Sequence, residues 1–188
     1  MVGSIVTSIN VAAIAGSLRK GSFNRAALVA ASELAPDGME IVIHGLDDIP
    51  FYDADLEREH GYPEPVSALR EVVSNADALL LATPEYNGST TGVLKNALDW
   101  LSRGGPDSAL RGKPTATMGA GGRFGSLRAQ LHLREILASS GSELVGGQVM
   151  IDAAPTRFDD DLRLTEERYR SQIAKMLEGL AVRVHTLR

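Results

Sequence analysis

The sequence predicts an α/β fold in which a parallel sheet of five strands is covered by helices on both faces. Two observations support this prediction. Short apolar segments alternate along the chain with amphipathic helical segments, and each apolar segment is nearly continuous. A near-continuous apolar run is typical of a strand that is buried on both faces. The intervening helices supply the right-handed crossovers that parallel strands require.

The five expected strands are the apolar runs themselves, and Gly146-Gly147 interrupt the last of them. Their ranges are Ile9–Ala15, Met39–His44, Ala78–Thr83, Pro114–Met118 and Glu143–Ile151. Helices are expected between and after them. Apolar residues recur at i, i+3, i+4 and i+7 in two segments, Leu94–Leu101 and Ile173–Leu180, which is the pattern of a helix with one buried face.

Three further helices are expected at Arg25–Leu34, Val66–Val73 and Leu127–Ser139, the last two with weaker periodicity. The acidic run Asp159–Asp161 is interpreted as the entry of the last helix, where negative charge suits the helix dipole. The segment Asp47–Pro65 is long for a loop in a compact α/β domain, and loops of this length are usually functional or mobile.

Composition limits the classes of function. A chain of 188 residues is expected to form one domain, residues 1–188. The net charge of −5 disfavours nucleic acid or an anionic membrane as the main partner. The absence of cysteine excludes disulfides, thiolate metal sites and a cysteine nucleophile, and no metal site is assigned. No apolar stretch is long enough to span a bilayer and the first residues do not resemble a signal peptide, so a cytoplasmic location is the default expectation.

The segment Gly16–Asn24 carries the strongest functional signal. It lies between the first expected strand and the first expected helix. Backbone N–H groups in such a turn and the positive end of the helix dipole favour an anion. Ser17, Ser22 and Asn24 add polar donors and Arg19 adds a full positive charge, a set that suits a phosphate. A capped turn without a ligand is the alternative, although a cap alone needs only one such side chain.

The spacing in this segment excludes two familiar nucleotide motifs. Gly16 and Gly21 have the spacing of a triphosphate-binding P-loop, but Ser22-Phe23 follow where that loop needs Lys and then Ser or Thr. The dinucleotide motif G-x-G-x-x-G fails because Leu18 occupies the position of its second glycine. What remains is a loop suited to a single terminal phosphate.

Two more loops follow strands and are expected at the same edge of the sheet. If the strand order is 2-1-3-4-5, the loop Thr83–Gly92 lies directly beside the first loop. Its Asn87-Gly88 is a turn dipeptide that permits positive φ, and Tyr86 is available to pack on a ring. The loop Gly119–Gly125 contains four glycines, which permit close approach of a ligand to the backbone.

Each of these two loops, taken alone, also fits an ordinary connection, a strand-to-helix turn in one case and a flexible turn in the other. Together with the phosphate loop they favour a phosphorylated flat ring, such as flavin mononucleotide (FMN).

The three motifs Gly16–Asn24, Pro84–Gly88 and Leu94–Trp100 together resemble the NAD(P)H-dependent FMN reductase family, and most of all its bacterial chromate and quinone reductases. The resemblance covers nearly the whole chain. It implies a flavodoxin-like three-layer sandwich with a five-stranded sheet of order 2-1-3-4-5, bound FMN, NADPH or NADH as co-substrate, and a homodimer or homotetramer.

The resemblance also implies roles for individual residues. Gly88 stands where near relatives often carry a larger residue, which would widen the pocket, and 123–134 fall where relatives often place subunit contacts. The residues implied to bind the FMN phosphate are Ser17, Arg19, Ser22 and Asn24, with Phe23 beside them. Those implied to line the flavin ring, largely through backbone atoms, are Pro84, Glu85, Tyr86, Asn87, Gly88 and Ser89. Those implied to lie along the pyrimidine side of the ring are Gly119, Gly121 and Gly122.

In the implied reaction, electrons pass from the nicotinamide through the flavin to a quinone-like acceptor, with chromate, azo compounds and free flavin as further acceptors of relatives. No catalytic acid or base is needed, so no histidine is assigned a role and Glu85 is given a surface or interface role. A non-enzymatic flavodoxin-like electron carrier or an FMN-binding regulatory module remains the alternative. A phosphatase or kinase is disfavoured because the cysteine and the P-loop lysine are missing.

Overall fold

The computed structural model describes residues 8–188 and contains the parallel sheet that the sequence predicts. The strand order is β2-β1-β3-β4-β5, with a further strand, β6, paired to β4. The strands are β1 (Ile9–Ala15), β2 (Met39–His44), β3 (Ala78–Ala82), β4 (Pro114–Ala120), β5 (Glu143–Leu144) and β6 (Val149–Ile151). The expectation about a signal peptide concerns residues 1–7, which lie outside the described part of the chain.

The sheet has six strands rather than five because the predicted fifth strand is divided. β5 pairs with the start of β4, where Pro114 lies opposite Glu143, and β6 pairs with its end, where Ala120 lies opposite Ile151. Gly146, with a φ of 68°, lies between the two pieces. A positive φ breaks the extended backbone, and glycine accepts it without a steric penalty.

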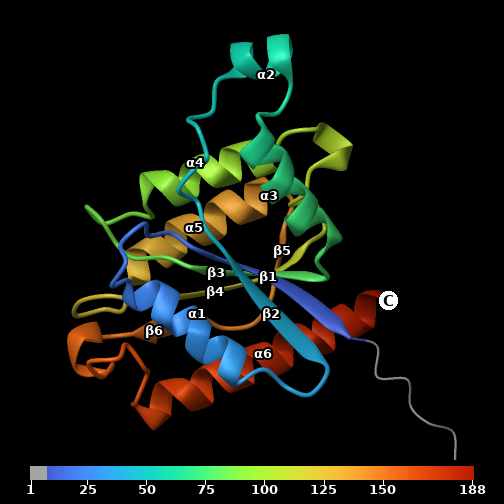
Figure 1. Ribbon diagram of the computed structural model, residues 1–188. Helices are drawn as coiled ribbons and strands as arrows, with labels where there is room; N and C mark the ends of the chain where they lie inside the picture. Colours follow the sequence, from blue (N-terminus) through green and yellow to red (C-terminus); the bar gives the residue numbers. More distant parts are fainter. Residues whose placement is uncertain (1–7) are drawn as a thin grey trace, which may run out of the picture.

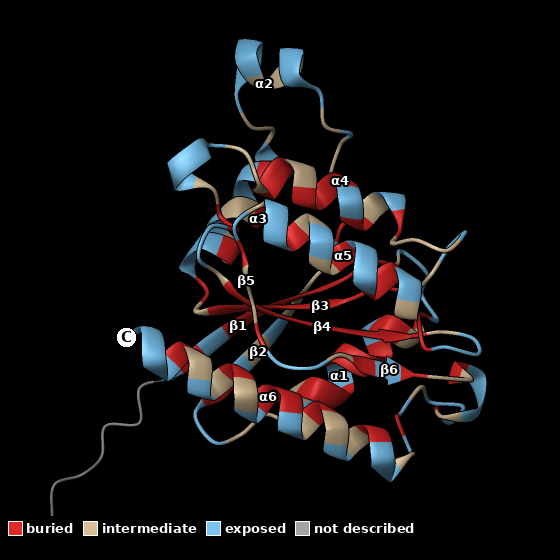
Figure 2. Ribbon diagram, turned by 180° about the vertical axis from the view of Figure 1, so that it is seen from behind, coloured by how far each residue is buried: buried red, intermediate tan, exposed pale blue. Residues whose placement is uncertain are grey.

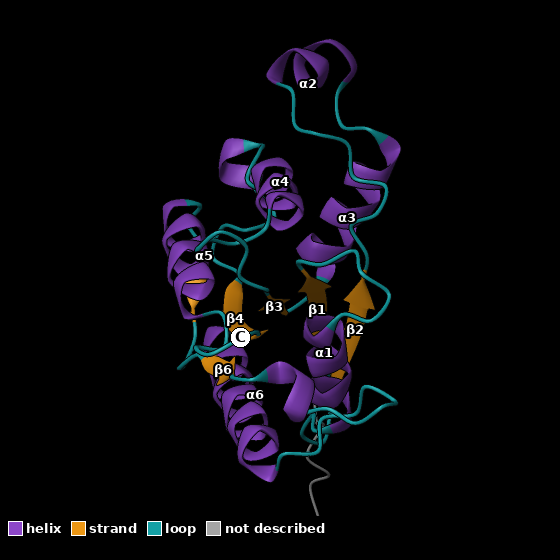
Figure 3. Ribbon diagram, turned by 90° about the vertical axis from the view of Figure 1, so that its left-hand side faces the viewer, coloured by secondary structure: helices purple, strands orange, loops and turns teal. Residues whose placement is uncertain are grey.

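Helices cover the two faces of the sheet, so the molecule has three layers (Figures 1 and 3). On one face lie α1 (Phe23–Glu33) and α6 (Glu167–Leu187), and on the other α3 (Glu64–Asn75), α4 (Gly92–Leu101) and α5 (Leu127–Ser139). Alternate residues of each strand serve opposite faces. In β3, Leu80 packs in the core beneath α1 and α6, whereas Leu79 and Leu81 pack beneath α3, α4 and α5. The central strands are accordingly buried throughout (Figure 2).

The long segment after β2 is not a simple loop, because it contains a short helix, α2 (Ala54–His60). This helix has no buried residue and projects away from the body of the molecule (Figures 1 and 2). Its base is fixed to α4, since Pro50 O accepts hydrogen bonds from Asn96 Nδ2 and Trp100 Nε1, both at 2.8 Å.

The interpretation of the acidic run before the last helix was wrong. Helix α6 begins at Glu167, whereas Asp159–Asp161 lie in a turn closed by the antiparallel bridge between Phe158 and Leu164. Local charge suggested a helix entry, but the pairing of these two apolar residues places the acidic run at an exposed turn. Two single 3-10 turns, Gly105–Asp107 and Ala154–Thr156, complete the described secondary structure.

No helix within residues 8–188 is long and apolar enough to cross a membrane. Over the same residues, no cluster of three or more His, Asp or Glu side chains is placed to hold a metal ion.

Candidate functional site

Three loops meet at the carboxyl ends of β1, β3 and β4, as the strand order requires. Hydrogen bonds join them in sequence. Gly16 N donates to Ala82 O at 2.8 Å, and Thr91 Oγ1 donates to Gly16 O at 2.7 Å. Thr83 N donates to Met118 O at 3.0 Å, which links the second loop to β4. The three segments singled out from the sequence therefore lie side by side at one edge of the sheet.

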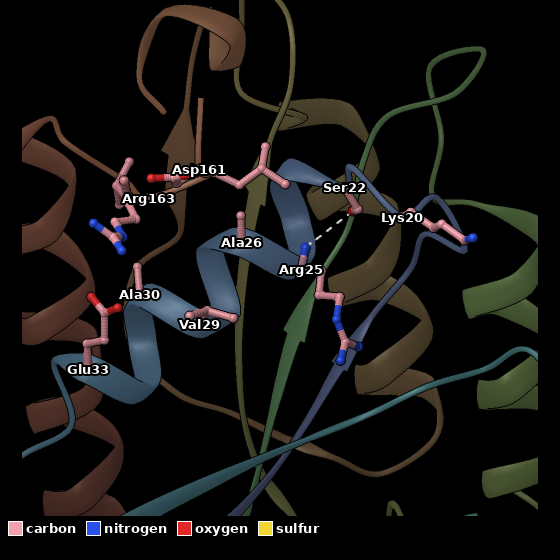
Figure 4. A pocket seen from close by; sticks show the side chains of 11 residues that line it. Lys20, Ser22, Arg25, Ala26, Val29, Ala30, Glu33, Asp161 and Arg163 are labelled. Atoms are coloured by element: carbon pink, nitrogen blue, oxygen red, sulfur yellow. Dashed lines mark hydrogen bonds between the residues drawn. The ribbon is translucent and has the colours of Figure 1, made fainter. Parts of the chain in front are cut away.

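The first loop is shaped by its own polar groups. Ser22 is the N-cap of α1, and its Oγ accepts a hydrogen bond from Arg25 N at 3.2 Å (Figure 4). Ser17 Oγ accepts one from Arg19 N at 3.4 Å, and the Arg19 guanidinium donates to Gly21 O at 3.2 Å. These contacts hold the loop closed while leaving the hydroxyl protons and most guanidinium N–H groups available.

The donor set of this loop fits a phosphate. Among residues 8–188, the backbone N–H groups of residues 20–24 have no protein acceptor. They belong to the turn and to the first residues of α1, where a helix cannot satisfy its own N–H groups. Five free N–H groups beside Ser17, Ser22 and Arg19 make a suitable cradle for a dianionic oxygen group. The binding roles of these residues remain predictions.

Asn24 is used differently from its neighbours. The residue is only 3% exposed, and its side chain pairs with the backbone of Ala120 at the end of β4. Asn24 Nδ2 donates to Ala120 O, and Asn24 Oδ1 accepts from Ala120 N, both at 2.9 Å. The side chain thus bridges α1 and β4, and only its second amide N–H is left for the predicted phosphate contact. The partly buried ring of Phe23 packs on Phe158 with centroids 5.2 Å apart.

The second loop forms a tight two-residue turn. Tyr86 and Ser89 exchange backbone hydrogen bonds, both at 3.1 Å, and the central residues Asn87 and Gly88 have φ values of 52° and 76°. Positive φ at both positions is the type I′ turn that Asn-Gly favours. Pro84 is buried, whereas Tyr86 is 51% exposed. The turn therefore presents a rigid backbone edge and one exposed aromatic ring beside the phosphate loop.

Glu85 caps a neighbouring helix. Its Oε2 accepts hydrogen bonds from Arg128 N at 3.0 Å and Ala129 N at 3.4 Å, in the first turn of α5. The N-cap residue Ser126 makes no side-chain cap of its own, so Glu85 supplies the missing acceptor from another loop. Sequence analysis missed this role because no local signal reports a cap that comes from a distant residue. It also missed the contact between Ser89 Oγ and His132 Nδ1, at 3.0 Å.

The glycines of the third loop serve different purposes. A Cβ on Gly119 would lie 1.9 Å from Ser126 Oγ and 2.5 Å from Thr83 O, so the space beside Gly119 is filled by the chain itself. Gly121 is tied to β6, because its N–H donates to Ile151 O at 3.0 Å. Among the glycines of this loop, only Gly122 has open space where a Cβ would lie. Of the three, Gly122 has the geometry expected for close approach of a ligand.

A side-chain network that sequence analysis did not identify supports this third loop. Ala153 N and Ala154 N donate to Gly122 O and Gly121 O, each at 2.9 Å. The adjacent Asp152 accepts from Arg157 Nη2 at 3.1 Å, and hydrogen bonds from Tyr169 and then Arg157 lower the pKa of its carboxyl. Burial, followed by this carboxylate, raises the pKa of Tyr169. The network anchors the segment that holds the glycine turn.

Comparison with known proteins identifies the family. A family model described as NADPH-dependent FMN reductase matches residues 9–156. Over 182 residues the chain is 46% identical to the NAD(P)H-dependent FMN reductase of Pseudomonas aeruginosa, covering 96% of this chain and 97% of that protein. It is 42% identical over 178 residues to the NAD(P)H:quinone oxidoreductase of Solanum tuberosum, covering 92% and 91% of the two chains.

A solved structure agrees with these sequence similarities. The flavoenzyme NAD(P)H:(acceptor) oxidoreductase FerB from Paracoccus denitrificans matches with a TM-score of 0.80 at 28% identity, covering 93% of this chain and 98% of that chain. The expected flavodoxin-like fold and the expected resemblance to quinone reductases are both confirmed. The chain therefore belongs to the NADPH-dependent FMN reductase family.

Proposed function

We propose that this chain binds FMN at the three loops and uses it to pass two electrons from NADPH or NADH to a quinone-like acceptor. The observation that carries the proposal is the cradle of free N–H groups at residues 20–24, together with Ser17, Arg19 and Ser22. The reductase and quinone oxidoreductase activities in the names of its relatives support the same reaction. Chromate, azo compounds and free flavin are further acceptors to test.

The protein's part in this reaction is to bind and orient. The phosphate cradle fixes one end of the cofactor, and the rigid turn Pro84–Ser89 with Gly122 offers backbone groups to the ring. Bound FMN supplies the two-electron chemistry. The exposed ring of Tyr86 is placed to contact a flat substrate from the solvent side. No side chain is assigned as a catalytic acid or base.

The rest of the assignment is also proposed. Residues 1–188 form a single domain that acts in the cytoplasm as a homodimer or homotetramer. Phe124 and Leu131 belong to the segment 123–134 expected to make subunit contacts, and at 57% and 52% exposure both are accessible for such contacts. Size-exclusion chromatography with light scattering measures the oligomeric state directly.

The test is an absorbance spectrum of the purified protein followed by stopped-flow reduction with each nicotinamide nucleotide. We expect a yellow protein that oxidises NADPH or NADH and turns over with a quinone. A colourless protein that takes up no FMN on incubation contradicts the proposal. A flavoprotein that shows no steady-state turnover of either nucleotide is instead an electron carrier or a regulatory module.

A further inference from the structure

A cavity of 480 Å³ lies at the carboxyl ends of β1 and β2, next to the phosphate loop. Strand β2 is on the opposite side of β1 from β3, so the cavity lies outside the space between the second and third loops that is proposed for the flavin ring. Its volume is in the range that small-molecule sites occupy. It shares Ser17 and Arg19 with the predicted phosphate site, and the rest of its lining includes Leu18, Lys20, Arg25, His44 and Asp47.

The cavity is rich in unpaired positive charge. Arg19, Lys20 and Arg25 form no ion pair among residues 8–188, although the whole chain carries a net charge of −5. Asp47 is the only acidic side chain in the lining. Burial lowers the pKa of His44, which favours the uncharged imidazole.

The two cations Lys20 and Arg25 also border a groove of 320 Å³ along α1. Glu33, Asp161 and Arg163 line the rest of that groove, and Figure 4 shows Lys20 and Arg25 at the opposite end from Glu33 and Arg163. Their positive charge is therefore not neutralised along the groove.

Together, Arg19, Lys20 and Arg25 carry more positive charge than one phosphate monoester needs to balance its own charge. A phosphate monoester carries about −1.5 to −2 at pH 7, and Arg19 with the free N–H groups of the first loop already matches it. Lys20 and Arg25 are then left for a second anion. An arginine can bind a phosphate through two N–H groups at once, and a lysine acts as a point charge.

We propose that Lys20 and Arg25 bind the 2′-phosphate of NADPH, with the adenosine in the cavity between β1 and β2, and that they make NADPH the preferred nucleotide. The proposal rests on the proposed function. The 2′-phosphate is a monoester that NADPH carries and NADH lacks. Cations in the pocket would therefore raise the affinity for NADPH relative to NADH by binding this group. Leu18, an exposed apolar side chain of the lining at 47% exposure, offers a surface for the flat base.

The test uses the FMN-loaded enzyme and the variants Arg25→Gln and Lys20→Gln. In each, the ratio of the KM for NADPH to the KM for NADH should rise by about 10-fold to 100-fold, the effect of one charged hydrogen bond. Asp47→Asn should lower this ratio, because it removes the one negative charge of the cavity. Arg111→Gln is the matched control, since this exposed cation lies just before β4 at the opposite edge of the sheet and the ratio should not change.

A second measurement uses inhibitors. Adenosine 2′,5′-bisphosphate should compete with NADPH more than tenfold better than adenosine 5′-monophosphate, and Arg25→Gln should abolish that advantage. The proposal is overturned if the wild-type protein prefers NADH, or if both KM values change equally in the variants. It is also overturned if only FMN affinity falls, because Lys20 and Arg25 then serve the FMN phosphate. Loss of the proposed function itself appears separately, as absence of FMN or of turnover with either nucleotide.

Discussion

Two sets of charged side chains at opposite edges of the sheet differ in whether they are paired. At the carboxyl edge, Arg19, Lys20 and Arg25 form no ion pair within residues 8–188. At the amino edge, Asp77 pairs with Arg188 at 2.8 Å and accepts a hydrogen bond from Asn10 N, also at 2.8 Å.

Lys113 follows the pattern of the amino edge. Its Nζ donates to Ser74 O at 3.1 Å and to Ala76 O, at the end of α3. Asp77 and Lys113 are thus satisfied internally at the amino edge, whereas Arg19, Lys20 and Arg25 have no ion-pair partner among the described residues at the edge where parallel α/β sheets bind ligands. The comparison predicts that substitutions at the carboxyl edge change binding and those at the amino edge change stability.

The largest expected effect is on FMN affinity. Arg19→Ala should weaken FMN binding by about 1.5–3 kcal/mol, roughly 10-fold to 150-fold in Kd, because a charged hydrogen bond to the phosphate is lost. Fluorescence titration of the apoprotein with FMN measures this change. The unfolding midpoint of the apoprotein should stay the same, as it should in the control Arg111→Ala. Unchanged FMN affinity would place the phosphate elsewhere and remove the contrast between the two edges.

Asn24→Ala sharpens the comparison, because this side chain lies at the carboxyl edge but is internally satisfied. The variant leaves the buried N–H and C=O of Ala120 without partners and should lower the free energy of unfolding by about 1–3 kcal/mol. Urea denaturation measures the loss, with Asn75→Ala, at an exposed position, as the control. A stable variant with weak FMN binding would instead assign Asn24 mainly to the phosphate.

The smallest expected effect lies at the amino edge. Asp77→Asn should lower the free energy of unfolding by about 0.2–1 kcal/mol, as for other partly exposed ion pairs, and leave FMN affinity unchanged. Denaturation and FMN titration of this variant check both statements, with Asp37→Asn, at an exposed position, as the control. Weaker FMN binding in Asp77→Asn alone would break the division between the edges.

The same pair predicts a pH dependence. Burial raises the pKa of the Asp77 carboxyl, but hydrogen bonds from Arg188 and Asn10 outweigh burial and leave the pKa below its ordinary value of 3.8. A carboxyl with a lowered pKa stabilises the folded protein fully above its unfolded pKa, and this contribution is lost as the pH falls through the folded pKa. Denaturation below about pH 4 should therefore show a smaller acid-induced loss in Asp77→Asn than in the wild type.

Much of the fold was predictable because it depends on local pattern. The bounds of β1 and β2 follow from continuous apolar runs, and the helix expected at Leu127–Ser139 is confirmed as α5 although its periodicity is weaker. The turn at Asn87-Gly88 follows from the tolerance of these residues for positive φ. The acidic run at Asp159–Asp161 misled because charge near a helix is only a weak indicator of where the helix begins.

The functional assignment of individual residues was less predictable, because a polar side chain in a loop can face a ligand or its own chain. Asn24 and Gly119 looked equivalent to their neighbours in the sequence. In the structure, Asn24 meets Ala120, 96 residues away, and the space beside Gly119 is taken by Ser126 and Thr83. Such contacts depend on the packing of elements far apart in the chain, so the local sequence gives no signal for them.

The sequence by itself determined where the first four strands begin, which loops follow them, and that the loop Gly16–Asn24 is suited to a phosphate, since these depend on hydrophobic period and turn chemistry. Only the tertiary structure decided which donors of that loop stay free and that Lys20 and Arg25 line a second cavity. The physical reason is that hydrogen-bond and charge satisfaction are set by neighbours in space, and most of those neighbours are far apart in the chain.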